Sequence, residues 1–355
     1  MSHRFSGPLA ALIAAALASC ALAACGSSKT TTSKTAAANN TAAATTSSHY
    51  PVTVENCGTP VTFQAAPTRA VSNDINTTED MLALGLEHSM VGTFGVTGDG
   101  PVNQPVPTQY EAGFKEVRDV SSNYFTLEPL IGLRPDFLFA GWFYGLTPGT
   151  RLTPNGLAKF GIKTLVLAES CAQVQSGHKS VSIDETYQDL ENLGQIFDVP
   201  ERADALVDQM KAEVAGVQAK VANLKPVTVF DYDSGTSAPV TGPGLAMPTA
   251  LAELAGGVNI FASLKESWTT VSWEQVVKRQ PQRIIINDYS TPTWQQKLKF
   301  LRTFAATKNL PAVRNNCVIP LSYDEVTPSP RNAEAVVALA RLLHPTAFGL
   351  PARVS

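Results

Sequence analysis

One short pattern occurs twice in the chain and constrains its fold more than any other feature. Each copy has a hydroxyl residue, a glutamate two positions later, a proline seven positions after the glutamate, and then an apolar run. The first copy is Thr126, Glu128, Pro135 and 137–140, and the second is Ser272, Glu274, Pro281 and 284–286. A hydroxyl residue just before an acid is typical of a helix start, and an apolar run after a proline turn predicts a buried strand. The spacing between the copies is far too large for a solenoid repeat. We therefore interpret them as corresponding points of two similar α/β lobes.

Strand and helix signals alternate on both sides of a longer helical region. The segments 69–72, 90–92 and 163–167 are expected strands, and 80–85 is an expected helix capped by Thr77 or Thr78. Such alternation predicts a mostly parallel sheet in each lobe.

Residues 184–225 interrupt this alternation with two helices, one over 184–197 and one that begins at Pro200 and runs to Leu224. The second has one apolar stripe of Leu206, Met210, Val214, Val217, Val221 and Leu224. A helix of this length would reach about 36 Å and act as a stiff bridge. The sequence thus predicts an α/β fold with two Rossmann-like lobes, 51–183 and 226–355, joined through 184–225 by one long helix.

The chain begins with the features of an export signal. His3 and Arg4 precede an apolar stretch that ends in Leu22-Ala23-Ala24-Cys25, so residues 1–24 are expected to be a signal peptide. The segment before Cys25 resembles the bacterial lipobox, which implies a lipid on the Cys25 thiol, although an ordinary signal with an incidental cysteine is the alternative. Residues 26–50 are mostly Ser, Thr and Ala and are expected to form a disordered tether. The location predicted from these features is the extracytoplasmic face of the cell membrane, with a lipid anchor.

Three cysteines remain in the exported chain, namely Cys57, Cys171 and Cys317. They allow three possible pairs in an oxidising compartment. We favour Cys57 with Cys171, since both lie in the first lobe, and expect Cys317 to be buried outside the bond. Three unbonded core thiols are the alternative.

Composition and motifs exclude several function classes. The formal net charge of −3 and the absence of a basic run argue against nucleic acid as a partner. The sequence contains no nucleophile elbow, phosphate-binding glycine loop or zinc-protease motif, and its five histidines lack metal-ligand spacing. We therefore expect no catalysis, no intrinsic cofactor and no protein-held metal, with a site of several tyrosines and acids as the open alternative for a metal.

Taken together, the lipobox, the tether, the two lobes, the long helix and the doubled Glu–Pro pattern resemble class III solute-binding proteins of bacterial ABC importers. The resemblance covers about residues 50–345 and is best over 126–141 and 268–288, while 256–260 looks like the family's Gly-Gly-x-Asn turn. It implies a monomer that docks on an importer permease, with Glu128 and Glu274 bonded to permease arginines. The helix dipole alone would also favour an acid in a first turn.

Ligands of open α/β sheets bind beyond the carboxyl ends of the strands. In the first lobe the loop 141–145 follows a predicted strand and offers Trp142 and Tyr144, whereas Phe143 is expected to pack. Candidates in the second lobe are Asp233, Trp268, Tyr289, Tyr323 and Arg331. Arginine and tyrosine would suit an anionic, aromatic or catecholate-like ligand.

The leading hypothesis is a membrane-tethered receptor that captures an iron–siderophore or corrinoid-like (cobalamin-like) solute for an ABC importer, with modest lobe closure. One alternative is a different organic solute, such as a precursor of a deazaflavin cofactor. Another is an extracytoplasmic enzyme or sensor that reuses the scaffold.

Overall fold

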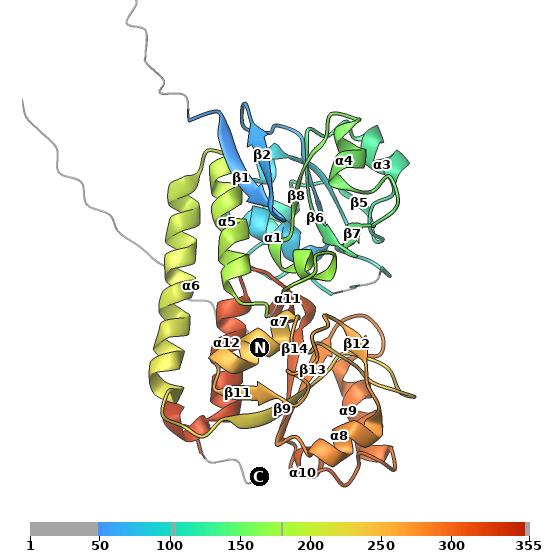
Figure 1. Ribbon diagram of the computed structural model, residues 1–355, viewed down its shortest axis with the longest axis vertical. Coiled ribbons are helices and arrows are strands. Elements are labelled where there is room, and N and C mark those ends of the chain that lie inside the picture. The colour runs from blue at the N-terminus through green and yellow to red at the C-terminus, as the bar shows by residue number, and fades with distance from the viewer. Residues whose placement is uncertain (1–48, 101, 103, 179, 352–355) are drawn as a thin grey trace, which may run out of the picture. The chain divides into compact units, whose positions relative to one another are not determined.

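Two parallel β-sheets organise the part of the chain that the computed structural model describes, which is residues 49–351 without 101, 103 and 179 (Figure 1). The first sheet has the strand order β5-β4-β3-β6-β7, with β8 also paired to β6, and the second has the order β11-β9-β13-β14. The first-sheet strands are β3 Ala70–Asn73, β4 Met90–Phe94, β5 Asp119–Ser121, β6 Phe137–Trp142, β7 Gly145–Leu146 and β8 Lys163–Val166. The second-sheet strands are β9 Val227–Tyr232, β11 Gly257–Asn259, β13 Arg283–Asp288 and β14 Val318–Ser322. All pairings within both sheets are parallel, so the predicted α/β fold with two lobes is confirmed.

Helices flank these sheets, and two short antiparallel pairs lie outside them. The pairs are β1 Val52–Asn56 with β2 Thr59–Phe63, and β10 Val240–Thr241 with β12 Thr269–Thr270. The first-lobe helices are α1 Ile75–Ala83, α2 Glu111–Phe114, α3 Leu127–Gly132 and α4 Pro154–Ala158, with 3₁₀ turns at Glu87–Ser89 and Ala168–Gln173. The second-lobe helices are α7 Met247–Leu254, α8 Trp273–Arg279, α9 Trp294–Thr303, α10 Pro311–Arg314, α11 Tyr323–Val326 and α12 Asn332–Leu343, with a 3₁₀ turn at Pro345–Phe348.

The doubled sequence pattern marks equivalent places in the two lobes. Thr126 is the N-cap of α3, which leads to β6, and Ser272 is the N-cap of α8, which leads to β13. This strand pairs in each case with the first strand of its own sheet along the chain, β6 with β3 and β13 with β9. The two helix starts differ in one respect. Ser272 forms a capping box with Gln275, whereas the Thr126 side chain makes no capping hydrogen bond.

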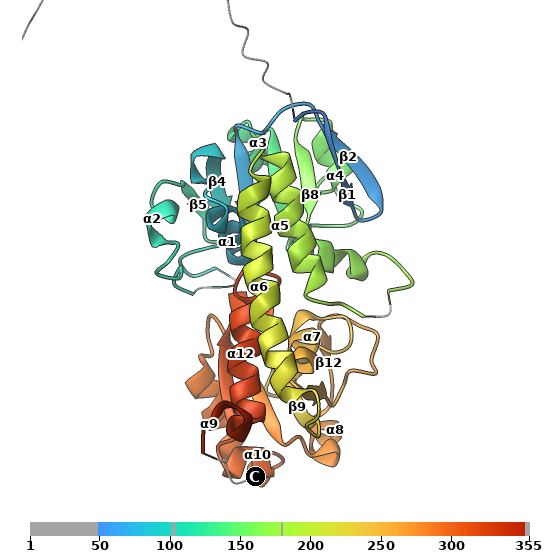
Figure 2. The same ribbon diagram turned by 90° about the vertical axis from the view of Figure 1, so that its left-hand side faces the viewer.

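Two helices, α5 Asp184–Ile196 and α6 Pro200–Val221, connect the lobes. In Figures 1 and 2, α6 runs along both lobes, beside α5 in the first and α12 in the second. Its buried face consists of Ala203, Val207, Met210, Val214, Val217 and Val221. The predicted stripe was therefore wrong at both ends. Leu206 is only half-buried, and Leu224 lies beyond the helix with 40% of its surface exposed.

The first helix of the first lobe, α1, begins earlier than the sequence predicted. α1 spans Ile75–Ala83, and its N-cap is Asp74, whose carboxylate accepts a hydrogen bond from the Ile75 amide at 2.7 Å. The expected caps lie inside the helix, where the Thr77 and Thr78 hydroxyls donate to main-chain carbonyls of the preceding turn. The correction has a local cause. Asp74 adopts a left-handed φ of 87°, which ends the strand and turns the chain abruptly into the helix.

One disulfide closes a long loop of the first lobe. Cys57, in the turn between β1 and β2, bonds to Cys171 in the 3₁₀ turn after β8, with the Cα atoms 5.4 Å apart. This is the pair favoured from the sequence, and Cys317 is buried in the second lobe outside the bond. Within residues 49–351, apart from the three gaps, no helix is long and apolar enough to cross a bilayer. The predicted signal peptide 1–24, Cys25 and nearly all of the tether lie outside the described residues.

Candidate functional site

Side chains from the carboxyl ends of strands in both sheets meet between the lobes. Tyr323, directly after β14, donates its phenolic proton to Asp74, directly after β3, over 2.8 Å. The indole N–H of Trp268 donates to the hydroxyl of Tyr144 over 2.8 Å, again across the lobes. Three of the ligand residues predicted from sequence, Tyr144, Trp268 and Tyr323, are thus brought to the interlobe contact.

Asp74 is the central acceptor of this contact. Its Oδ2 atom accepts from Tyr124 of its own lobe at 2.7 Å and from Tyr323 of the other lobe, while Oδ1 accepts from the Ile75 amide. Burial raises the pKa of Asp74 to about 6, although these three hydrogen bonds oppose the shift. A non-glycine residue with left-handed backbone at a strand end is often part of a functional site.

The second lobe contributes a matching acidic group. Asp233 follows β9 and accepts from the Tyr289 hydroxyl at 2.8 Å, and the ring of Tyr289 packs edge-on against Tyr323 with centroids 5.5 Å apart. Beneath them lies the buried ammonium of Lys297, 4.4 Å from the Tyr289 ring centroid. Tyr289, Tyr323 and Asp233 therefore form one continuous surface with the Asp74 group.

Arg331 lies in a cluster of carboxylates. Its guanidinium is 2.6 Å from Asp324, 3.2 Å from Glu325 and 3.6 Å from Glu334. Burial alone would raise the pKa of Asp324, but hydrogen bonding with Glu79 and the charge of Arg331 hold it below its usual range. Because the charge of Arg331 is already balanced, an anionic ligand would have to compete with these carboxylates.

The three aromatic residues 142–144, at and just after the end of β6, lie in different environments. Tyr144 reaches the interlobe contact, whereas Trp142 lines a hollow of about 560 Å³ within the first lobe, beside Cys57. The expectation that Phe143 packs was wrong, since 56% of its surface is exposed. Phe143 and Tyr124 line an open hollow of about 570 Å³. Phe143 also has a left-handed φ of 63°.

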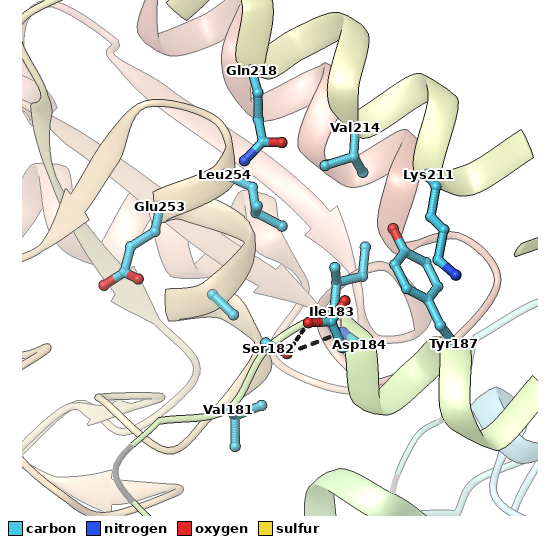
Figure 3. A pocket seen from close by; sticks show the side chains of 11 residues that line it. Val181, Ser182, Ile183, Asp184, Tyr187, Lys211, Val214, Gln218, Glu253 and Leu254 are labelled. Atoms are coloured by element: carbon cyan, nitrogen blue, oxygen red, sulfur yellow. Dashed lines mark hydrogen bonds between the residues drawn. The ribbon is translucent and has the colours of Figure 1, made fainter. Parts of the chain in front are cut away.

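Another cavity of about 600 Å³ lies between the start of α5, the middle of α6 and the end of α7 (Figure 3). Its apolar wall includes Val181, Ile183 and Val214, and its polar edge includes Lys211 and Glu253. It contains none of the ligand residues predicted from sequence. It is therefore a feature of the junction between α6 and the lobes, apart from the aromatic site.

The two glutamates of the doubled pattern are solvent-exposed. Glu128 lies in the first turn of α3 and Glu274 in the first turn of α8. In Figure 1 both helices lie on the side of the molecule away from α6. These carboxylates are accessible to a partner protein, one from each lobe.

Several further buried carboxyl groups are protonated more readily than usual. Burial, with the nearby charge of Glu185, raises the pKa of Glu169 to about 8, and burial is also the main cause that raises the pKa of Asp231 to about 8. Among the described residues, no group of three or more histidine, cysteine or acidic side chains is arranged to hold a metal ion.

Two α/β lobes with an aromatic and acidic contact between them define a two-lobed solute-binding protein. The family model for periplasmic binding proteins matches residues 71–324, and the chain belongs to this family. A vitamin B12-binding protein of Photorhabdus laumondii is 27% identical over 241 residues, 68% of this chain and 76% of that protein. Another of Yersinia pestis is 28% identical over 223 residues, 62% of this chain and 70% of that protein. These relatives are named as binding proteins.

Solved structures have the same fold. A periplasmic binding protein from Veillonella parvula gives a TM-score of 0.71 at 25% identity, with 83% of this chain and 97% of that chain covered. A protein from Saccharomonospora viridis, titled as part of an ABC-type Fe3+-hydroxamate transport system, gives 0.70 at 22% identity over 83% of this chain and all of that chain. The periplasmic vitamin B12-binding protein of Vibrio cholerae gives 0.57 at 23% identity over 79% and 98%.

Sequence reasoning missed Asp74, Tyr124 and Asn287 as members of the site. Asp74 follows the apolar strand β3 as Asn73-Asp74, and a polar pair at a strand end was the available signal. Tyr124 lies in a segment without regular structure between β5 and α3, so no periodicity marked it.

Proposed function

We propose that this protein is an extracytoplasmic solute-binding lipoprotein. In this proposal it is anchored by lipid on Cys25, captures a large chelate or organic solute between its lobes, and delivers it to an ABC importer permease. The ligand would contact Tyr144, Asp233, Trp268, Tyr289 and Tyr323, together with Asp74 and Tyr124. No catalytic role is proposed.

The observation that carries this proposal is the convergence of aromatic side chains from both lobes on one contact. Trp268 bonds to Tyr144 and Tyr323 bonds to Asp74, and each pair joins strand ends or loops of different sheets. A solute entering there would replace interlobe contacts by contacts to itself, which couples binding to the angle between the lobes. The packing of α6 against both lobes favours a small change of that angle.

Docking on the permease is proposed through Glu128 and Glu274. Both are exposed in helix first turns, where a carboxylate is favoured by about 0.3–1 kcal/mol. Arginines on a partner would add charge-assisted and possible bidentate hydrogen bonds. One acidic group on each lobe would let the permease sense both lobes at once.

The test is charge reversal at both positions, Glu128→Arg with Glu274→Arg, in cells that depend on this protein for uptake. Uptake is measured with iron-radiolabelled ferrioxamine B and cobalt-radiolabelled cyanocobalamin, and affinity of the purified protein is measured for the same two probes. We expect uptake to fall at least tenfold while affinity is unchanged.

The matched control is Glu201→Arg with Asp208→Arg, which makes the same charge change at exposed positions of α6, one of them in a helix first turn. This control should transport normally. Normal uptake by the Glu128 and Glu274 variant would show that the docking assignment is wrong.

A further inference from the structure

Most hydrogen-bond donors of the interlobe site are already in use. Tyr124 and Tyr323 donate to Asp74, Tyr289 donates to Asp233, and the N–H of Trp268 donates to Tyr144. A carboxylate is only an acceptor, and a phenol that has donated its proton keeps its lone pairs. Apart from the Tyr144 hydroxyl, which accepts from Trp268 and keeps its own proton, these groups therefore offer acceptor capacity.

An acceptor without a partner lies next to Asp233. The side chain of Asn287, at the carboxyl end of β13, is fully buried, and its Nδ2 atom donates to Asp233 at 3.3 Å. That contact fixes which end of the amide is the oxygen. Within the described residues, Oδ1 of Asn287 has no hydrogen-bond partner. Asn287 also hydrogen-bonds with the buried carboxyl group of Asp231, and among the described residues Oδ1 of Asp231 likewise has no partner, so the two side chains add acceptor capacity beside Asp233.

Of the nearby cations, Lys297 interacts electrostatically with Asp233, but it is buried beneath the contact and leaves the acceptors at the surface unpaired with a cation. The ammonium of Lys297 donates to the main-chain carbonyl of Asn287 at 2.6 Å and is covered by the Tyr289 ring. Arg331 is surrounded by its three carboxylates. No ion pair to Asp74 or Asp233 occurs among the described residues, so each carboxylate is bonded to neutral donors only.

We propose that the interlobe site selects solutes that present hydrogen-bond donors or positive charge, and that it rejects anionic chelates. Asp74 in the first lobe and Asp233 with Asn287 in the second are the specificity-determining residues. The inference rests on the proposed function and narrows its ligand class to neutral or cationic solutes. It reverses the expectation from sequence, in which Arg331 favoured a catecholate-like anion.

The mechanism of selection is competition for Asp74. Tyr323 donates to this carboxylate from the opposite lobe, and a ligand donor would take its place when the lobes separate. A positive group gains from both carboxylates, whereas a negative group is repelled by both in a site of low dielectric.

The experiment is titration of the purified mature protein, by tryptophan fluorescence and calorimetry, with three probes of different charge. These are ferrioxamine B, a ferric trihydroxamate with a protonated amine, neutral cyanocobalamin, and a trianionic ferric tris-catecholate. We expect ferrioxamine B or cyanocobalamin to bind at least tenfold more tightly than the tris-catecholate.

Variants separate ligand recognition from folding. Asp74→Asn and Asp233→Asn should each weaken the cationic probe at least tenfold, and Asp204→Asn, an exposed position on α6, should have no effect. Tyr323→Phe keeps the ring but removes the competing donor, so it should tighten ferrioxamine B, which a purely structural role would not do. Thermal melts confirm that each variant is folded.

The outcomes are distinguishable. Tighter binding of the tris-catecholate, or unchanged affinity in both aspartate variants, overturns the inference and leaves the proposed function in place. If the folded protein binds none of the three probes, the inference is overturned, and so are the siderophore and corrinoid ligands of the proposed function.

Discussion

Removing the Cys57–Cys171 disulfide should cost a large part of the stability of the first lobe. The bond joins residues separated by 114 positions, and the loop-entropy relation gives about 4.8 kcal/mol at room temperature for a loop of this length. The perturbation is the double variant Cys57→Ala with Cys171→Ala, which avoids adding a hydroxyl to the buried Cys171 site. Both residues belong to the first lobe, so the loss should appear in the unfolding of that lobe.

The assay is urea unfolding followed by circular dichroism, with and without a reductant. The double variant should lose about 3–5 kcal/mol and show a larger m-value, because its unfolded chain is more expanded. Reduction should produce the same loss in the wild type and no change in the double variant. The matched control Cys317→Ala removes the other described cysteine and should retain the response to reductant. A loss below about 1 kcal/mol would refute the reasoning, because it would mean that the unfolded chain is already compact without the bond.

The Cys57–Cys171 disulfide should also affect ligand binding at the candidate site. Ser170, beside Cys171, accepts a hydrogen bond from the main-chain N–H of Trp142 at 2.9 Å, so the disulfide braces the strand end that carries Tyr144. We expect the double variant to bind solute more weakly even where it is fully folded.

Three further predictions concern stability. Glu169 keeps its proton up to about pH 8 when folded but only to about pH 4.5 when unfolded, so folding takes up a proton in that window and stability falls as pH rises through it. Glu169→Gln should therefore reduce the slope by up to about 1.4 kcal/mol per pH unit between about pH 5 and about pH 8, measured by urea unfolding. An unchanged slope would contradict the assignment, and the control is Glu191→Gln at a half-buried position on α5. Met210→Ala should lower the free energy of unfolding by about 2–5 kcal/mol, because Met210 is buried on α6. Leu224→Ala should lower it by less than about 0.5 kcal/mol, because Leu224 lies beyond the helix end and is partly exposed. Equal losses would show that both residues belong to one buried stripe. Arg331→Gln leaves the fully buried carboxylate of Asp324 without its cation, so the variant should lose about 3–5 kcal/mol of stability in urea unfolding. A variant of normal stability would show that Arg331 is available to a ligand instead.

The lobes and the order of their elements could be predicted from sequence because both depend on local signals. The doubled pattern around Glu128 and Glu274 placed α3 with β6 and α8 with β13, and the apolar stripe located α6. Binary patterning and turn residues determine such elements within a few positions. Helix ends were less certain, as at Asp74 and Leu224, because a left-handed backbone or a fraying end leaves little trace in the sequence.

Only the tertiary structure decided which side chains share a site. Tyr323 and Asp74 are 249 positions apart, and Trp268 and Tyr144 are 124 apart. Sequence alone identified Arg331 as a candidate cation for a ligand, but the fold places it among Asp324, Glu325 and Glu334. The composition of a strand end is a property of the chain, whereas the balance of charge at a contact depends on which segments the two sheets bring together.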